Sequence, residues 1–164
     1  MKAWWSDDGW HKIGPTHSGG FHVNYGRVVI AAVVAWVVYF TYGFLVHGIL
    51  IARDYVPYPE GVYRSGEAAR SHMLIGLAGL LVAIVVFATI YAKGCERARG
   101  VGEGARLGLL FGIFMAGAFA AVNYGTINIS GKLALELAGS ALVEWTMVGI
   151  VIGLIYRPRV AAAS

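Results

Sequence analysis

The sequence is poor in cysteine and in charge. Cys95 is the only cysteine among 164 residues, so no internal disulfide can form, and no neighbouring His or Cys gives it metal-ligand spacing. We interpret it as an ordinary thiol. Charged residues make up 13% of the chain and hydrophobic residues 58%. A soluble domain of this length needs far more polar surface to cover its core, so the composition excludes that class.

The motifs of soluble enzymes are missing as well. The sequence contains no nucleotide-binding glycine loop after a strand, no nucleophile elbow, no paired-cysteine zinc pattern and no c-type haem attachment sequence. The segment GVGEG at 100–104 lacks the strand context of a phosphate-binding loop. We therefore predict no catalytic residue, no metal site and no enzymatic activity, and the sequence requires no cofactor.

What the sequence does have is a set of long apolar runs. A membrane-spanning helix needs about 20 mostly apolar residues, and only helices and closed barrels satisfy their backbone hydrogen bonds inside hydrocarbon. The runs lack the alternation of barrel strands. We therefore predict an all-α integral membrane protein, an antiparallel bundle of four transmembrane helices with a short ordered N-terminal segment. The transmembrane domain covers residues 28–156, with spans at about 28–52, 73–92, 105–127 and 133–156.

Two short segments flank this domain, a polar leader at 1–27 and a C-terminal tail at 157–164. The leader is too short and too rich in glycine to make a core. It carries Trp4, Trp5 and Trp10, and such rings are favoured anchors in protein interfaces. We predict that they dock on a partner subunit. For Trp10 the lipid headgroups are the favoured alternative.

The basic residues predict an orientation. With four spans, the N-terminus, the second loop and the C-terminus share one side, which holds nine of the 13 Lys and Arg residues. By the positive-inside rule, both termini are then cytoplasmic, and we expect a bacterial inner membrane. The net charge of +4 requires no nucleic-acid partner, because basic residues flank the helices and can meet anionic lipid.

A polar stripe enters the fourth span. Lys132, Glu136, Ser140 and Glu144 are each four residues apart, so they share one helix face. Glu144 lies about 17 Å into the run, near the membrane midplane. An isolated ionised carboxylate there costs at least ~2.5 kcal/mol. The stripe should therefore face the bundle, another subunit or water.

Partners for this stripe can be chosen by depth. Side chains near the outer ends of the other spans are expected to approach Glu136, and two deeper tyrosines of the first span to reach Glu144. The first group is His47, His72, Asn123 and Tyr124, and the second is Tyr39 and Tyr42. Two interpretations stay open: structural hydrogen bonds that hold the helices in register, or a proton, ion or ligand site. His47 is also a weak candidate for ligating a porphyrin or chlorin metal.

Small residues predict close helix packing. Helices in lipid pack where glycines let their backbones approach, and two spans carry glycines at four-residue spacing. These are Gly104, Gly108, Gly112, Gly149 and Gly153. We expect them to pack inside the bundle rather than against another subunit.

Several segments carry a family resemblance. They are GFLVHG at 43–48, GEGARLGLLFG at 102–112, VNY at 122–124 and MVGIVIGLIYRP at 147–158. With these segments the chain resembles bacterial four-span membrane proteins of uncharacterised function. The resemblance implies the fold and a bacterial inner membrane, and it implies no catalytic residue. The tryptophan-rich leader does not belong to it.

Three functions fit these features. The first, which we favour, is an accessory subunit of a larger membrane complex, with a respiratory or photosynthetic one as a guess. The second is a small proton- or ion-coupled transporter that uses Glu144. The third is a protein that binds pigment, quinone or lipid between its spans.

Overall fold

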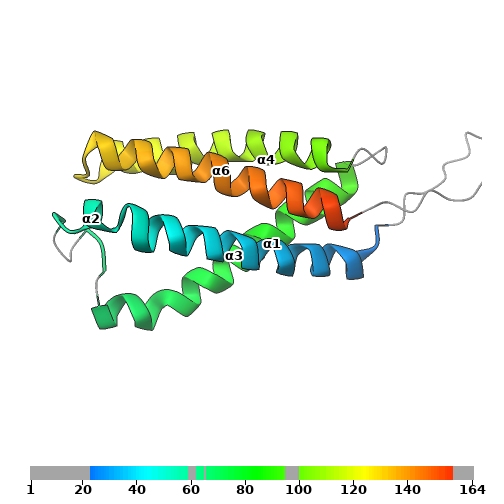
Figure 1. Cartoon of the computed structure of the whole chain (residues 1–164), viewed down its shortest axis with the longest axis horizontal. Coiled ribbons are helices and arrows are strands. Elements are labelled where there is room, and N and C mark those ends of the chain that lie inside the picture. The colour runs from blue at the N-terminus through cyan, green and yellow to red at the C-terminus, as the bar shows by residue number, and fades with distance from the viewer. Residues whose placement is uncertain (1–22, 59–61, 65, 95–99, 157–164) are drawn as a thin grey trace, which may run out of the picture.

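The computed structural model describes residues 23–58, 62–64, 66–94 and 100–156, and this part of the chain is all-helical (Figure 1). Four helical stretches are long and apolar enough to cross a membrane, as the sequence predicts. They are Tyr25–Leu50, Gly66–Gly94, Val101–Thr126 and Gly131–Ile155. The expected ordered leader with Trp4, Trp5 and Trp10, the tail and Cys95 all lie outside the described residues.

Two of the four stretches contain a π-helical segment. The first consists of α1 (Tyr25–Leu45) and the π-helical η2 (Val46–Leu50), and the short α2 (Ala52–Tyr55) follows. The second is α3 (Gly66–Gly94). The third consists of α4 (Val101–Met115), the π-helical η3 (Ala116–Ala121) and α5 (Val122–Thr126), and the fourth is α6 (Gly131–Ile155).

Polar caps and glycines set the helix ends. The Asn24 side chain accepts a hydrogen bond from the Arg27 amide at 3.2 Å, and Ser130 accepts one from the Leu133 amide at 3.1 Å. Such caps satisfy amides that have no partner within the helix. Gly100, just before α4, has a φ of +58°, which suits glycine because it has no Cβ. All four helices begin earlier than the apolar runs, since polar residues continue the helix beyond the hydrophobic segment.

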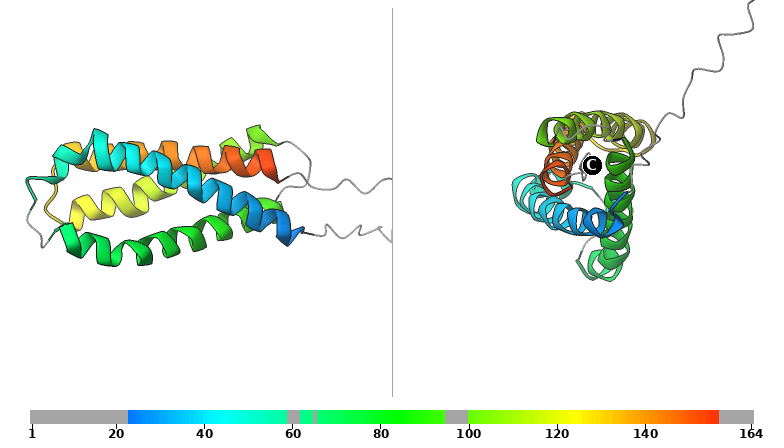
Figure 2. Two further views of the ribbon diagram at one scale, coloured as in Figure 1. Left: turned by 60° about the horizontal axis from the view of Figure 1, so that its bottom comes forward. Right: turned by 90° about the vertical axis from the view of Figure 1, so that its right-hand side faces the viewer.

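The helix α6 occupies the centre of the fold. It packs against α4 on one side and α1 on the other, while α3 packs mainly against α1. Figure 2 shows the long helices lying along one direction, with the start of α3 set apart from the rest. A cluster of aromatic rings joins the helices near their middle. The Trp145 ring on α6 lies 5.9 Å from Tyr39 on α1, 5.6 Å from Phe87 on α3 and 4.7 Å from Phe111 on α4.

The contact between α4 and α6 is formed by backbone against backbone. We call the five glycines that line it, Gly104, Gly108 and Gly112 on α4 with Gly149 and Gly153 on α6, the glycine seam. A Cβ atom added to Gly112 would lie 2.9 Å from the Leu142 Cα, and one on Gly104 would overlap the Gly149 carbonyl. The glycines therefore lie inside the chain's own fold, where their missing side chains allow the two backbones to touch.

The first half of α3 has little packing. Every described residue of 66–76 is exposed, whereas Ile84, Phe87 and Ala88 further along are buried. The Trp36 indole on α1 donates a hydrogen bond to the Leu77 carbonyl at 3.1 Å. Figure 1 shows the N-terminal end of α3 lying apart from α1.

Candidate functional site

The buried carboxylate of Glu144 is the centre of the candidate site. Glu144 is 3% exposed and lies on the face of α6 that contacts α1. Ser140, one turn earlier and also buried, donates a hydrogen bond to Glu144 Oε1 at 2.9 Å. The same oxygen lies 3.2 Å from Nε2 of His47. Ser140 Oγ lies 3.1 Å from that nitrogen, so the three side chains form a closed triangle.

The site extends from His47 toward the end of the molecule that holds α2. His47 is in η2, and its Nδ1 lies 3.1 Å from the Tyr55 hydroxyl on α2. Gly43, one turn earlier on α1, leaves room beside the pair. A Cβ atom there would lie 3.6 Å from Glu144 Oε1 and 3.9 Å from His47 Cδ2. Three helical elements, α6, η2 and α2, thus supply a continuous hydrogen-bonded line from Glu144 through His47 to Tyr55.

Two protonation states of His47 satisfy this line. With a neutral His47, Nε2–H donates to the Glu144 carboxylate and the Tyr55 hydroxyl donates to Nδ1. With a protonated His47, both ring nitrogens donate, and the Tyr55 oxygen accepts at Nδ1. The second state pairs an imidazolium with the carboxylate, and this neutralises the buried charge that the sequence places in the span. The heavy-atom contacts of His47 are therefore compatible with either state of its ring.

A second polar group continues the stripe toward α2. Lys132 Nζ lies 2.7 Å from Asp54 Oδ1 and 3.4 Å from Glu136 Oε1. The second oxygen of Glu136 is buried and has no hydrogen-bond partner among the described residues. Tyr55 lies between the two groups. Burial, and then the nearby Tyr63, Glu144 and Glu136, raise the pKa of Tyr55 to about 12.

Beyond Glu144 the polar line continues, among the described residues, only to the Tyr39 side chain on α1. On the following turns of α6 the residues that face the core are Trp145, Val148 and Ile152, all buried. The aromatic cluster around Trp145 lies on this side, and its Phe87 and Phe111 rings offer no partner for a proton or an ion. In this conformation the site connects toward the α2 end of the molecule and not toward the end where α3 leads into α4.

The structure brings only some of the predicted residues together. Tyr39 interacts with Glu144 by a side-chain hydrogen bond, and Tyr42 is near enough to interact with its charge. His47 contacts Glu144, whereas depth alone predicts an approach to Glu136. The other candidates lie elsewhere. His72 is exposed on α3 and contacts Ser71 and the Ala68 carbonyl, Asn123 lies half-buried on α5, and the exposed Tyr124 lies near Gly131.

The hydrogen bonds of His47 bear on the porphyrin or chlorin prediction. Both of its ring nitrogens already have partners, Tyr55 at Nδ1 and Glu144 with Ser140 at Nε2. An axial bond to a metal would have to replace one of these partners. Among the residues described, no three His, Cys, Asp or Glu side chains are grouped as a metal site.

Sequence reasoning missed three residues of this region. Tyr55 and Asp54 fall between the first two predicted spans, although Tyr55 follows His47 by eight residues, a spacing of about two helical turns. Trp145 was passed over because it is an apolar residue in an apolar run. An aromatic residue beside the only buried acid of that run was the available signal.

Comparisons with protein-family models, with curated proteins and with solved structures find no match to this chain. The resemblance to bacterial four-span membrane proteins therefore stays a prediction, and functional inference depends on the geometry described above.

Proposed function

We propose that the protein is a non-catalytic accessory subunit of a larger membrane complex. In this proposal its four spans form an antiparallel bundle in a bacterial inner membrane. Both termini face the cytoplasm, as the distribution of Lys and Arg favours, and the tryptophan-rich leader docks on a neighbouring subunit.

The observation that carries the proposal is the unpacked first half of α3. Gly76 and Gly79 lie on this half, and a Cβ atom on either would meet no described atom within 4 Å. Small residues in membrane helices favour close approach of another helix. Lipid tails do not require glycines for packing, because their flexible chains also fill the space beside larger side chains. A helix of a partner subunit would use this surface, while the second half of α3 packs inside the chain.

Native gels after mild detergent extraction from the native membrane test the proposal. We expect the parent chain in a species larger than the monomer, together with other proteins. Gly76→Leu should release it, because the new side chain fills the space that the partner helix needs. Gly139→Leu on α6 is the matched control, since a Cβ there also meets no described atom within 4 Å.

Two results would contradict the proposal. One is migration of the parent only as a free monomer. The other is a larger species that contains only copies of this chain, which would make the protein a homo-oligomer and not an accessory subunit.

A specific observation favours a second candidate function, proton- or ion-coupled transport. Glu144 is buried in a span and hydrogen-bonded to His47, and acids inside membranes are functional suspects by default. The line from Glu144 to Tyr55 would supply one half of a path, from the outer side in the proposed orientation. A second conformation would have to open the aromatic cluster around Trp145.

A liposome assay tests this candidate. Purified parent and Glu144→Gln protein are reconstituted at equal density, and proton flux is followed with an internal pH-sensitive dye. Transport through this site predicts a loss of flux in Glu144→Gln but not in Lys132→Met, which alters only the exposed end of the stripe. Equal flux in parent, Glu144→Gln and protein-free liposomes would exclude it.

A further inference from the structure

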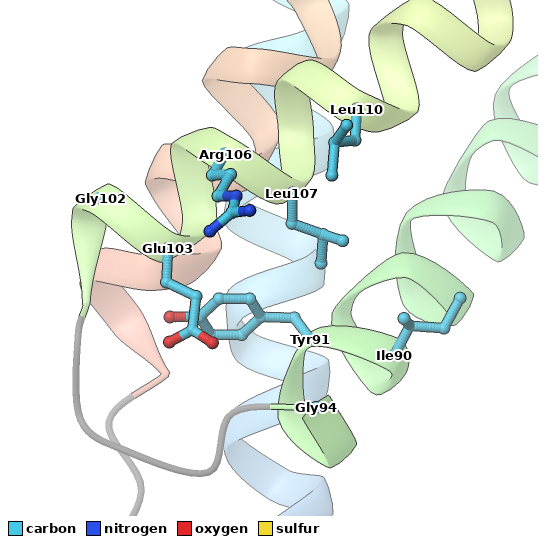
Figure 3. A pocket seen from close by; sticks show the side chains of 8 residues that line it. All are labelled: Ile90, Tyr91, Gly94, Gly102, Glu103, Arg106, Leu107 and Leu110. Atoms are coloured by element: carbon cyan, nitrogen blue, oxygen red, sulfur yellow. The ribbon is translucent and has the colours of Figure 1, made fainter.

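A pocket of about 640 Å³ lies between the end of α3 and the start of α4 (Figure 3). This volume is within the range of small-molecule sites. The pocket is at the opposite end of the molecule from α2, so it is separate from the Glu144 site. It is lined by Ile90, Tyr91, Gly94, Gly102, Glu103, Arg106, Leu107 and Leu110.

The pocket follows from how the helices pair. The glycine seam holds α4 against α6, and α3 packs mainly against α1. The ends of α3 and α4 are thereby kept apart, although they are adjacent along the chain. Deeper in the fold the two helices meet again, where the rings of Phe87 and Phe111 lie 5.3 Å apart. This ring contact lies beyond the pocket on the side of the membrane core.

The lining divides into an apolar part and a polar mouth. Ile90, Leu107 and Leu110 supply apolar walls, and the side chains of Glu103 and Arg106 project from the first turns of α4 (Figure 3). Among the described residues, nothing closes the mouth beside Gly94 and Gly102, because a Cβ atom on either would meet no described atom within 4 Å. A ligand that fits both parts has an apolar chain and a charged head.

The charges near the mouth of the pocket favour a ligand with an anionic head group. Arg106 is exposed at the mouth and Lys93 is exposed in the last turn of α3, and these two basic side chains outnumber the one described acid of the mouth, Glu103. A guanidinium matches the geometry of a phosphate with two parallel hydrogen bonds. Basic residues at the end of a membrane helix attract anionic lipids. Both helices are candidate membrane spans, so the mouth lies at the level where lipid phosphates are found.

We propose that this pocket binds a glycerophospholipid, with one acyl chain between α3 and α4 and the phosphate on Arg106. The Tyr91 hydroxyl donates a hydrogen bond to the Gly100 carbonyl at 3.0 Å, and this bond joins the end of α3 to the residue before α4 at the edge of the pocket. The lipid fills a gap that the side chains of the described residues leave open. The site does not depend on the function of Glu144 or on a partner subunit.

Native mass spectrometry of the purified, delipidated protein tests the site, with phosphatidylglycerol as the probe. We expect one tightly retained lipid per chain. Arg106→Gln should weaken its binding about tenfold, because a charge-assisted hydrogen bond to phosphate is lost. Leu110→Trp should lower it further by filling the apolar part. Arg70→Gln removes an exposed charge from the other end of α3 and should leave binding unchanged.

Three outcomes would overturn the proposal. The first is equal lipid retention by parent, Arg106→Gln and Leu110→Trp, which would identify only unspecific surface lipid. The second is displacement of the lipid by inorganic phosphate alone, which would place the affinity in the head and not in the acyl pocket. The third is an equal loss in Arg70→Gln, which would indicate general charge attraction. Because Arg106 is exposed, circular dichroism should show an unchanged fold in Arg106→Gln, so its result can be read even if Leu110→Trp unfolds.

Discussion

The helix α6 contacts its two neighbours in physically different ways. Against α4 it presents the glycine seam, where backbones touch and side chains are absent. Against α1 it presents Glu144 and Ser140, whose hydrogen bonds to His47 join the helices. The first contact is specified by shape and the second by chemistry. Only the second can respond to protonation, because a backbone contact between glycines carries no titratable group.

The largest effect is expected from a side chain in the glycine seam. In Gly108→Val, the Cβ atom would lie 2.9 Å from the Thr146 Cα and would overlap the Trp145 carbonyl. Neither atom can move without shifting α6, so we expect the free energy of unfolding to fall by about 3 kcal/mol. Denaturant titration in detergent micelles measures this. Gly117→Val in the same span is the control, since no described atom lies within 4 Å of a Cβ there, and equal losses in both would contradict the seam.

A smaller effect is expected from breaking the polar contact. Glu144→Leu removes the acceptor that Ser140 and His47 share, and hydrogen bonds within membranes contribute about 1–2 kcal/mol at most. A double-mutant cycle with His47→Leu isolates the pair. We expect a favourable coupling energy of about 1 kcal/mol between the two side chains. Strictly additive losses would mean that the two residues do not interact.

The pH dependence should show a modest contribution from Tyr55. Its pKa is raised from 10.0 to about 12, first by burial and then by Tyr63, Glu144 and Glu136. The folded state therefore keeps the proton where the unfolded chain loses it. The stability that Tyr55 contributes is present below pH 10 and is lost as the pH rises through about 12. Phenolate absorbance should show a late-titrating component that Tyr55→Phe lacks, and an unchanged titration curve would contradict this.

The smallest effect is expected at the exposed end of the stripe. Lys132→Met removes ion pairs with Asp54 and Glu136, but its side chain is 67% exposed and surface pairs contribute little. In the same denaturant titration, we expect Lys132→Met to lose less unfolding free energy than Glu144→Leu. The loss should be smaller still at high salt, because screening already weakens the ion pairs of the parent. A loss equal to that of Glu144→Leu would show that the outer group matters as much as the buried one.

The parts of the structure that follow from regular periodicity could be predicted from the sequence. The lengths of the apolar runs predict the four candidate spans, and the four-residue spacing puts Glu144 and Ser140 on one face of α6. The partner of His47 could not be predicted in this way. The sequence gives the depth of His47 only relative to the end of the apolar run, but the helical path continues beyond that end through η2 and α2 to Tyr55. His47 therefore lies about two turns inside that end, level with Glu144 and not with Glu136.

The spacing of the glycines predicts close packing, but it does not identify which helix each one faces. That choice depends on the positions of whole helices, which no local pattern encodes. The unpacked half of α3 could not be predicted for the same reason. Its sequence resembles that of any apolar span, and only the distances to the other helices show that Gly76 and Gly79 have no internal partner.

The π-helical segment η2 has a consequence for how this chain can change by insertion and deletion. A wide turn accommodates one residue more than an α-helical turn, and each residue of a helix accounts for about 100° of rotation. Loss of one residue from 46–50 would restore α-helical winding and leave the direction of the following α2 nearly unchanged, because the wide turn already absorbs that rotation. The contacts of Tyr55 with His47 and of Asp54 with Lys132 should therefore survive such a deletion. A homologue one residue shorter in this segment could keep the same outer connection to the buried acid.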